Sequence, residues 1–553
     1  MKYPKKELAQ LVLEYCIAYG IDRIVISPGS RNAPLSIGFV NHPEIKTYSI
    51  VDERCAAFFA LGIAQQTRMP TAIVCTSGSA LLNYYPAVAE AFYSNIPLIV
   101  ISADRPKHLI DVGDGQTIRQ ENVFLNHSEF NANLDDSLNL VDNADLLEKA
   151  FYNCLDKKGP VHINVPFDEP LYEVVDTLRI QRIEKFHYKK NTTKKSLELE
   201  HFGEIWNSSS RKMILIGEHV PDAILQKQLV SLAGDTSVLV LTETTSNLHH
   251  SKFIHSIDSL IFPLSEEQKL AFQPEVLITL GGMVISKRIK KILRNYQPAH
   301  HWHLGPKNAP NTYHCLSHHF SIDEVDFFNQ FFEIIRPLES EYQEKWLSVK
   351  SQREQQHHKY LSEAPFSDLK AFDIVLKSMP KDALLQASNS SVIRYLQLFK
   401  MDATIQTFCN RGTSGIDGST STAIGASLAT NKQTVFITGD ISFFYDSNAL
   451  WNTYIKNDFR IILINNSGGG IFKIIPGPQE SNALDYFETT HNMNASNLCR
   501  MYGLEYDAVS SETALKKSLK EFYNVSNSPK LLEIFTPRNS NDLILKNYFK
   551  YLE

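Results

Sequence analysis

Two predicted strand ends carry oxygen-bearing residues that could hold a metal ion on a diphosphate. A buried strand predicted over residues 434–438 leads into Gly439-Asp440, and another over 460–464 leads into Asn465-Asn466-Ser467-Gly468-Gly469-Gly470. The carboxyl ends of adjacent parallel strands meet at the sheet edge where α/β folds bind their ligands. A carboxylate, an amide carbonyl and a glycine carbonyl are hard ligands that suit Mg²⁺, with phosphate oxygens completing the octahedron.

Asp440 has a simpler alternative, an acid that caps a helix beside a Gly-rich turn, with the helix expected to begin near Asp446. Gly113-Asp114-Gly115 contains a second Gly-Asp pair, but no Asn pair follows at a similar distance and no strand leads straight into it. We therefore interpret that triplet as a loop. The full succession of strand, Gly-Asp, helix, strand, Asn-Asn and glycines favours metal and diphosphate binding.

Arginines beside glycine or proline turns could bind anionic substrates. One surface arginine after a strand is usually only solvated. Four of them indicate a pocket for carboxylates, which a guanidinium group binds through paired hydrogen bonds. The candidates are Ser30 and Arg31 in residues 27–35, Arg105 in 103–106, Ser390 and Arg394 one turn apart on a predicted helix, and Arg411 in the loop 410–418.

An acidic residue in the first third of the chain is a further candidate. A strand predicted over 47–51 is followed by Glu53 and by a helix of small residues over 56–65. The helix dipole alone favours an acid in the first helical turn, so a purely local role for Glu53 is the alternative. Residues 76–80 form another predicted strand-to-helix turn, with Glu90 on the helix that follows, predicted over Leu81–Tyr93.

Parallel sheets are needed to position these residues, and the chain predicts three. At 553 residues it is too long for one core, and short apolar runs alternate with helical stretches in three blocks. We expect an α/β fold of three doubly wound parallel-sheet domains, over residues 1–184, 198–338 and 362–553. Lys185–Lys195 is interpreted as a linker and Glu339–Leu361 as a polar helical connector. The other predicted strands are 23–27, 71–75, 98–102, 212–216, 237–241, 276–280 and 382–386.

Composition excludes several classes of protein. The hydrophobic content of 43% excludes a disordered chain. The 55 basic and 61 acidic residues give a net charge of −6, which disfavours a partner that is nucleic acid or an anionic membrane. Seven scattered cysteines without a C-x-x-C pair, and apolar runs far shorter than a membrane span, favour a cytoplasmic protein. The histidines at 300–303 and 318–319 lack zinc spacing, so we expect structural or solvated roles for them.

The Gly-Asp to Asn-Asn unit resembles the thiamin-diphosphate signature, although Ile441 stands where the signature has a third glycine. The segments SPGSRNAPL, DERCAAFFALG, SADRP, NRGTSGIDG, GDISFFYDSNAL and NNSGGGIF together resemble, in order, a single family. This is the family of 2-succinyl-5-enolpyruvyl-6-hydroxy-3-cyclohexene-1-carboxylate synthases of menaquinone biosynthesis. The similarity covers the first and last blocks and is thin in the middle one.

The resemblance assigns roles to the candidate residues. The first block would be the pyrimidine-binding domain, in which Glu53 activates the cofactor's aminopyrimidine, and the last block the diphosphate-binding domain. The cofactor thiamin diphosphate would be bound by Glu53, Ile416, Gly439, Asp440, Ser442, Asn466, Gly468, Ile471 and Phe472, with Mg²⁺ or Mn²⁺ on Asp440, Asn466 and Gly468. Substrates would be bound by Ser30, Arg31, Arg105, Gln116, Lys287, Arg394 and Arg411, and catalysis would involve Glu53, Arg31, Ser390, Arg394 and Arg411. The family has Asn-Gln where this chain has Gly115-Gln116, and Lys287 depends on a weak middle-domain match.

The implied activity is decarboxylation of 2-oxoglutarate on thiamin diphosphate and conjugate addition of the succinyl carbanion to isochorismate. Both substrates are dianions, which would account for arginines in an acidic protein. A homodimer or homotetramer is implied, because the cofactor-binding domains of such enzymes meet across a subunit interface. A 2-oxo-acid decarboxylase or acetohydroxyacid-type ligase is the nearest alternative, and it would share Glu53 and Asp440. A non-catalytic regulatory protein should have lost these acids, and a nucleotide-binding oxidoreductase is disfavoured because no G-x-G-x-x-G follows a strand.

Overall fold

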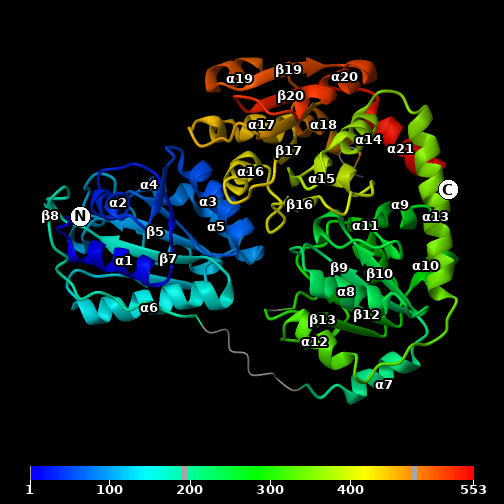
Figure 1. Cartoon of the computed structure of the whole chain (residues 1–553), viewed down its shortest axis with the longest axis horizontal. Coiled ribbons are helices and arrows are strands. Elements are labelled where there is room, and N and C mark those ends of the chain that lie inside the picture. Colours follow the sequence, from blue (N-terminus) through cyan, green and yellow to red (C-terminus); the bar gives the residue numbers. More distant parts are fainter. Residues whose placement is uncertain (1, 189–196, 308, 475–476, 478–481) are drawn as a thin grey trace.

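The computed structural model of this chain describes residues 2–188, 197–307, 309–474, 477 and 482–553. Three six-stranded parallel sheets, each packed among helices, follow one another along the chain (Figure 1). This arrangement confirms the predicted α/β fold class. The first sheet lies in the blue region of Figure 1, the second in the green region, and the third in the yellow to red region.

The N-terminal domain has the strand order β3-β2-β4-β5-β7-β6. Its central strands are buried along their whole length, as expected for a parallel sheet covered on both faces. The strands are β2 (Arg23–Ile26), β3 (Lys46–Ser49), β4 (Thr71–Cys75), β5 (Leu98–Asp104), β6 (Phe130–Asn133) and β7 (Val161–Pro166), with β1 (Tyr3–Pro4) paired antiparallel to β8 (Val174–Val175). The helices are α1 (Glu7–Ala18), α2 (Ala33–Asn41), α3 (Glu53–Thr67), α4 (Ser79–Asn83), α5 (Tyr85–Tyr93) and α6 (Leu140–Lys157), with short 3₁₀ turns η1 (Lys107–Leu109) and η2 (Leu125–His127).

The central domain has a different strand order, β11-β10-β9-β12-β13-β14. Its strands are β9 (Lys212–Ile216), β10 (Val238–Thr242), β11 (Phe253–Ile254), β12 (Val276–Leu280), β13 (His300–Leu304) and β14 (Leu316–Phe320). Its helices are α7 (Glu200–Ser208), α8 (Ala223–Leu232), α9 (Ile257–Ile261), α10 (Glu266–Phe272), α11 (Lys287–Asn295) and α12 (Glu324–Phe331), with η3 (Thr244–Ser246). The long helix α13 (Tyr342–Glu363) then runs along this domain to the next one (Figure 1).

The C-terminal domain has the order β16-β15-β17-β18-β20-β19, which repeats the N-terminal order strand for strand. Its strands are β15 (Leu384–Ala387), β16 (Gln406–Cys409), β17 (Thr434–Gly439), β18 (Arg460–Asn465), β19 (Glu505–Val509) and β20 (Lys530–Phe535). Its helices are α14 (Asp368–Ser378), α15 (Ser391–Leu396), α16 (Ser419–Ser427), α17 (Asp440–Tyr445), α18 (Leu484–Glu488), α19 (Ser496–Tyr502), α20 (Glu512–Phe522) and α21 (Asn541–Tyr551), with η4 (Ser447–Leu450) and η5 (Gly470–Lys473).

Two predicted helices differ from the structure. Near Asp446, the predicted start of a helix, the structure has the short 3₁₀ turn η4 from Ser447. An additional helix, α17, begins earlier at Asp440, because an acid favours the first turn of a helix. The single helix predicted over Leu81–Tyr93 is two helices, α4 and α5. Pro86 lies in the first turn of α5, where its missing N–H costs nothing. Most of the predicted linker, from residue 189 onward, lies outside the described residues.

Helices α3 and α16 hold the N-terminal and C-terminal domains of the chain together. A Cβ at Gly62 would lie 2.1 Å from the carbonyl oxygen of Thr422, and a Cβ at Gly425 would lie 1.9 Å from that of Phe59. The two helices therefore touch backbone to backbone, which only glycine permits at these positions. They lie side by side at the centre of Figure 1.

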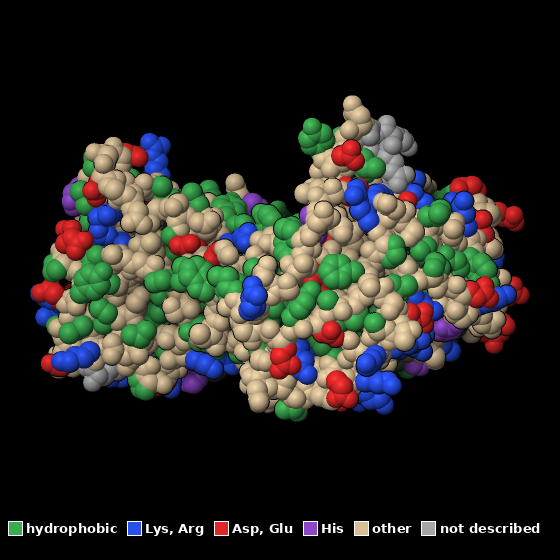
Figure 2. Space-filling view, turned by 90° about the horizontal axis from the view of Figure 1, so that it is seen from above, with side chains coloured by type: hydrophobic (Ala, Val, Ile, Leu, Met, Phe, Trp, Pro, Cys, Tyr) green, Lys and Arg blue, Asp and Glu red, His purple; other side chains and the backbone are tan. Residues whose placement is uncertain are grey.

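Charged side chains of both signs are interspersed on the face drawn in Figure 2, without a continuous basic area. Hydrophobic side chains are scattered among them, as on most protein surfaces. Within the described residues, no helix has both the length and the apolar composition that a membrane span requires.

Candidate functional site

Asp440 lies at the carboxyl edge of the C-terminal sheet, where β17 ends and α17 begins. Its side chain is buried, and its two oxygens accept the N–H of Ile441 at 2.7 Å and the N–H of Gly468 at 3.0 Å. The Nε2 of His491 lies 3.4 Å from Oδ2. These contacts hold the carboxylate still while leaving lone pairs free for a ligand.

The two asparagines after β18 have different environments. The side-chain amide of Asn465 makes its hydrogen bonds within the protein. Its Nδ2 donates to Glu533 and to the Met493 carbonyl, and its Oδ1 accepts the N–H of Ser467. Asn466 instead donates its Nδ2 to Asp368 Oδ2 at 3.0 Å, and its Oδ1 is buried without a hydrogen-bond donor.

A divalent cation fits this arrangement. A buried carbonyl oxygen without a donor is unfavourable unless something else satisfies it. Asn466 also lies two residues before Gly468, whose N–H donates to the Asp440 carboxylate. The Gly468 carbonyl accepts one hydrogen bond, from the N–H of Gly470 at 2.9 Å, and keeps a second lone pair. An acid, an amide oxygen and a backbone carbonyl form a hard donor set suited to Mg²⁺ or Mn²⁺.

Three apolar residues predicted to bind the cofactor, Ile416, Ile471 and Phe472, lie in loops and short helices near this edge. The hydroxyl of Ser442 in α17 donates to the carbonyl of Ile416 at 3.0 Å. This hydrogen bond joins the loop before α16 to α17, the helix that begins at Asp440. Ile416 is half-buried, whereas Ile471 on η5 is buried and Phe472 is half-buried. Gly439, also predicted to bind the cofactor, donates its N–H to Ser388 Oγ at 3.3 Å.

Arg394 and Arg411 lie close together at the same end of the C-terminal sheet. Burial and the neighbouring charge of Arg411 lower the pKa of Arg394. Arg411 donates through one terminal nitrogen to Asn389 Oδ1 at 2.6 Å, and its buried Nε has no hydrogen-bond partner. Ser390, immediately before α15, adopts φ +68° and ψ −126°, a strained conformation for serine that is common at functional sites.

Lys287 begins α11 of the central domain and its side chain is exposed. The electrostatic neighbours of Lys290, one turn later, include both Lys287 and Arg411, and burial lowers the pKa of Lys290. The central domain therefore presents cations toward the Arg411 loop. Sequence reasoning named Lys287 and missed Lys290, which has no motif of its own.

A second arginine pair lies at the carboxyl edge of the N-terminal sheet. Arg31 is buried, donates to the carbonyl of Phe167 at 2.8 Å and lies 3.3 Å from Glu169. Burial and the charge of Arg105 lower the pKa of Arg31, so the two cations are neighbours. The Nε atoms of both are buried without a partner. Unpaired buried donors of this kind are suited to an anion.

Arg105 is held by the loop that contains the second Gly-Asp pair. It donates to the carbonyl of Gly115 at 3.0 Å and lies 3.5 Å from Asp114. Gln116 is exposed with φ +56°, and Ser30 is also exposed. The interpretation of residues 113–115 as a loop is confirmed.

Glu53 is the first residue of α3, and the capping role belongs to its neighbour. Asp52 accepts the N–H of Cys55 at 3.1 Å, which leaves the Glu53 carboxylate free of that function. Burial and the adjacent Asp52 raise the pKa of Glu53. Glu53 in turn adds to the raised pKa of the buried Tyr84, so the two side chains are electrostatic neighbours.

The predicted site residues therefore form two groups. The contacts and charges described above for Glu53, Arg31 and Arg105 come from the N-terminal domain. Those of Asp440 and Asn466 come from the C-terminal domain. Arg411 has neighbours in the C-terminal and central domains, and its loop is also held by Glu90 of the N-terminal domain. No hydrogen bond or ion pair between described residues joins Glu53 to Asp440 or Arg31 to Arg411 within this chain.

Comparison with known proteins decides the family. The family model for the thiamine pyrophosphate enzyme N-terminal TPP binding domain matches residues 6–129, and that for the C-terminal TPP binding domain matches residues 389–534. A curated 2-succinyl-5-enolpyruvyl-6-hydroxy-3-cyclohexene-1-carboxylate synthase from Flavobacterium johnsoniae is 55% identical over 562 residues, covering 100% of both chains. Proteins of the same name from Flavobacterium psychrophilum and Porphyromonas gingivalis are 55% and 37% identical over 100% of this chain and 100% and 98% of theirs.

This chain belongs to that synthase family.

Membership in the synthase family confirms the resemblance found in the sequence and the class of thiamin-diphosphate enzymes. The two domain models likewise confirm thiamin diphosphate as the cofactor. The metal ion, the oligomeric state and the roles of single residues stay predictions.

Two residues that sequence reasoning gave no role have close contacts with the synthase site. Asp368 holds the Asn466 amide, and burial raises the pKa of Asp368 to about 6, against the hydrogen bonds that Thr536 and Asn466 donate. Glu90 of α5 accepts the N–H groups of Gly412 and Thr413 at 2.7 and 2.6 Å and also the Thr413 hydroxyl at 2.8 Å. It thereby fixes the loop that carries Arg411. Glu90 lies on the helix predicted after the turn at residues 76–80, whereas nothing local distinguishes Asp368.

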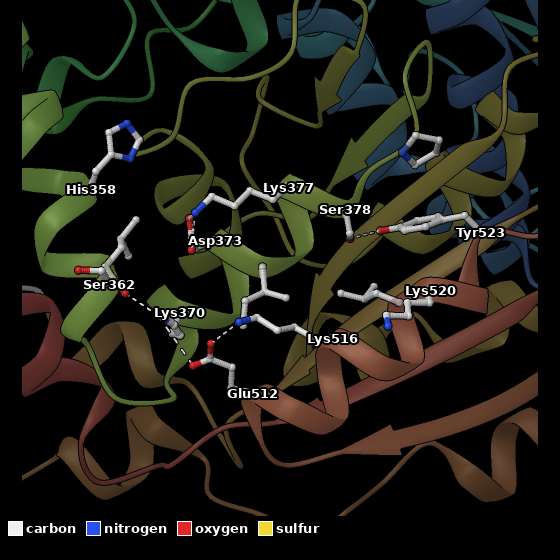
Figure 3. Close-up of a pocket in the computed structure, with 14 residues that line it drawn as sticks. His358, Ser362, Lys370, Asp373, Lys377, Ser378, Glu512, Lys516, Lys520 and Tyr523 are labelled. Atoms are coloured by element: carbon white, nitrogen blue, oxygen red, sulfur yellow. Dashed lines mark hydrogen bonds and ion pairs between the residues drawn. The ribbon is translucent and has the colours of Figure 1, made fainter.

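A cavity of about 700 Å³ lies away from these residues, between α13, α14 and α20 (Figure 3). Its two carboxylates are paired, Asp373 with Lys377 at 2.7 Å and Glu512 with Lys516 at 2.6 Å. None of the site residues predicted from the sequence lines it. We therefore assign it no part in the synthase site.

Proposed function

We propose that this protein decarboxylates 2-oxoglutarate and adds the remaining succinyl unit to isochorismate. The product would be 2-succinyl-5-enolpyruvyl-6-hydroxy-3-cyclohexene-1-carboxylate, the compound in the name of its curated relatives. The observation that carries the proposal is the set of arginines with buried, unpartnered Nε atoms at the ends of two sheets, Arg31, Arg105 and Arg411. A simple 2-oxo-acid decarboxylase would need fewer cations than two dianionic substrates require.

Thiamin diphosphate, when bound, supplies the electron sink that decarboxylation of a 2-oxo acid requires. Asp440, Asn466 and the Gly468 carbonyl would hold Mg²⁺ or Mn²⁺ on its diphosphate. Glu53 would hold a proton at the aminopyrimidine ring, a task suited to a carboxyl whose pKa is raised by burial. Ile471 and Phe472 would exclude water beside the thiazolium ring.

The substrate carboxylates would be bound by the two arginine pairs, with Ser30, Gln116, Ser390 and Lys287 as further hydrogen-bond donors. A homodimer or homotetramer would bring the N-terminal group of one subunit to the C-terminal group of another. Support comes from the family resemblance, which implies that the two cofactor-binding domains meet across a subunit interface. We also propose that the protein works in the cytoplasm, where its seven free thiols would stay reduced.

A coupled assay tests the proposal. Purified protein with thiamin diphosphate, Mg²⁺, 2-oxoglutarate and isochorismate is expected to release CO₂ and consume isochorismate in equal amounts. Asp440→Ala serves as the inactive control. Consumption of 2-oxoglutarate without loss of isochorismate would instead establish a simple decarboxylase.

A further inference from the structure

Asp368 lies far from the metal-binding motif in sequence but touches it in space. It is the first residue of α14, 98 positions before Asn466, and its side chain is buried. One carboxylate oxygen accepts the Nδ2 of Asn466 at 3.0 Å, and the other accepts the hydroxyl of Thr536 at 2.5 Å. The backbone N–H of Asp368 donates to Asn541 Oδ1 at 2.9 Å, which fixes the residue from a third segment.

These contacts determine which way the Asn466 amide faces. An ionised carboxylate can only accept hydrogen bonds, so the NH₂ group of Asn466 must face Asp368. The carbonyl oxygen of Asn466 then faces the opposite way, and there it is buried without any donor. The orientation thus follows from the chemistry of the pair and leaves the Asn466 oxygen turned away from Asp368, buried and free to bind a cation.

We propose that Asp368 is a positioning residue that turns the Asn466 carbonyl toward the divalent cation of the cofactor. The inference rests on the metal site of the proposed function. Residues that hydrogen-bond to metal ligands commonly change metal affinity by about 10–100-fold when they are replaced. A purely structural Asp368, which only joins α14 to the strand ends, would affect folding stability and leave metal affinity unchanged.

Asp368→Asn separates these two roles. With the Thr536 hydroxyl still donating to the side-chain oxygen, the new NH₂ group faces Asn466, whose amide must flip to accept it. Asn466 then presents NH₂ to the cation. We expect the affinity for Mn²⁺, measured by electron paramagnetic resonance of free Mn²⁺ with saturating thiamin diphosphate, to fall by about 10–100-fold. Asp373→Asn on the same helix is the matched control, because it loses an ion pair with Lys377 but does not contact Asn466.

Asn466→Asp makes the test a double-mutant cycle. The carboxylate that this substitution places at position 466 can accept a hydrogen bond from the new amide of Asp368→Asn through one oxygen. It presents its other oxygen to the cation without any flip. Asp368→Asn is therefore expected to weaken Mn²⁺ binding in the wild-type background and to leave it unchanged or stronger in the N466D background. In each background, the Mn²⁺ affinity with D368N is compared with the affinity without it. This comparison cancels the effect of the carboxylate that N466D adds.

Equal losses in the two backgrounds, or unchanged Mn²⁺ affinity of D368N, would overturn the proposal. If D368N does not fold on its own, whether or not N466D restores folding, Asp368 is structural and the proposal fails. Wild-type protein that binds thiamin diphosphate without Mn²⁺ or Mg²⁺ would instead refute the metal site of the proposed function, and this inference with it.

Discussion

The N-terminal and C-terminal domains have the same strand order but leave opposite groups unsatisfied at corresponding strand ends. After β5, the Asp104 carboxylate is satisfied by Asn164 at 2.7 Å and by the N–H of Arg105, while the Arg105 Nε is left without a partner. After β18, the Asn466 carbonyl is left without a donor. The end of β5 thus offers a donor for an anion and the end of β18 an acceptor for a cation, so the residues at the strand ends, and not the topology, decide the ligand.

The largest expected effect would come from removing the cation-binding side of this comparison. Asp440→Ala is expected to abolish binding of thiamin diphosphate at working Mg²⁺, because the metal loses its one charged protein ligand. Titration calorimetry measures this affinity. Asp114→Ala removes the acid of the other Gly-Asp pair and is expected to leave cofactor affinity intact; equal affinities for wild type and the Asp440 variant would refute the metal assignment.

The second prediction concerns Glu53 at the N-terminal edge. Glu53→Gln is nearly isosteric and should leave the fold and diphosphate binding in place. Loss of the carboxyl proton-transfer function is expected to slow exchange of the cofactor's thiazolium proton by about 10²-fold or more. Quenched NMR after deuterium exchange gives this rate, with calorimetry of cofactor binding as the control. Exchange at the wild-type rate in the variant would show that Glu53 has only a local role, as an acid in the first turn of α3.

The arginines allow a finer comparison between the edges. We expect at least one of Arg31, Arg105, Arg394 and Arg411 to serve isochorismate alone, so that its replacement by Ala weakens isochorismate use by about 1.5–3 kcal/mol. Reaction with 2-oxoglutarate should survive in that variant, as observed by pre-steady-state circular dichroism. Arg→Lys should restore little, since an ammonium cannot replace a planar guanidinium. If every variant loses activity toward 2-oxoglutarate and isochorismate to the same extent, the prediction that one arginine serves isochorismate alone is wrong.

The smallest expected effect concerns the helix cap beside Glu53. Asp52→Ala should lower the free energy of unfolding by about 0.5–2 kcal/mol at neutral pH, the usual cost of losing such a cap. Hydrogen bonds from Asn448 and Cys55 lower the pKa of Asp52 below its ordinary value, in spite of burial. Its contribution is therefore present above the ordinary Asp pKa and is lost as pH falls through the lower, folded-state value. Chemical denaturation of wild type and variant at neutral and at acid pH checks this. If the difference between their free energies of unfolding persists in acid, the carboxylate charge is not responsible for it.

The sequence predicted the parts of the synthase site that are contiguous in the chain. A strand, a Gly-Asp pair and an Asn-Asn pair are read locally, and the order of the strands then places them on one edge. Asp368 could not be predicted, because its contact with Asn466 exists only once α14 packs against the ends of β18 and β20. Nothing in the sequence offers a physical reason to prefer Asn466 over Asn465, and the structure supplies one through the Glu533 contact that occupies the Asn465 amide.

The backbone contact between α3 and α16 has a consequence for how this chain can vary. The obstacle to a larger residue at Gly62 or Gly425 is the carbonyl oxygen of the opposite helix, so no side-chain change across the contact could make room for a methyl group. The relative placement of the two domains therefore depends on glycine at both positions. Chimaeras that exchange whole domains between relatives should assemble only where both parents keep glycine at these positions.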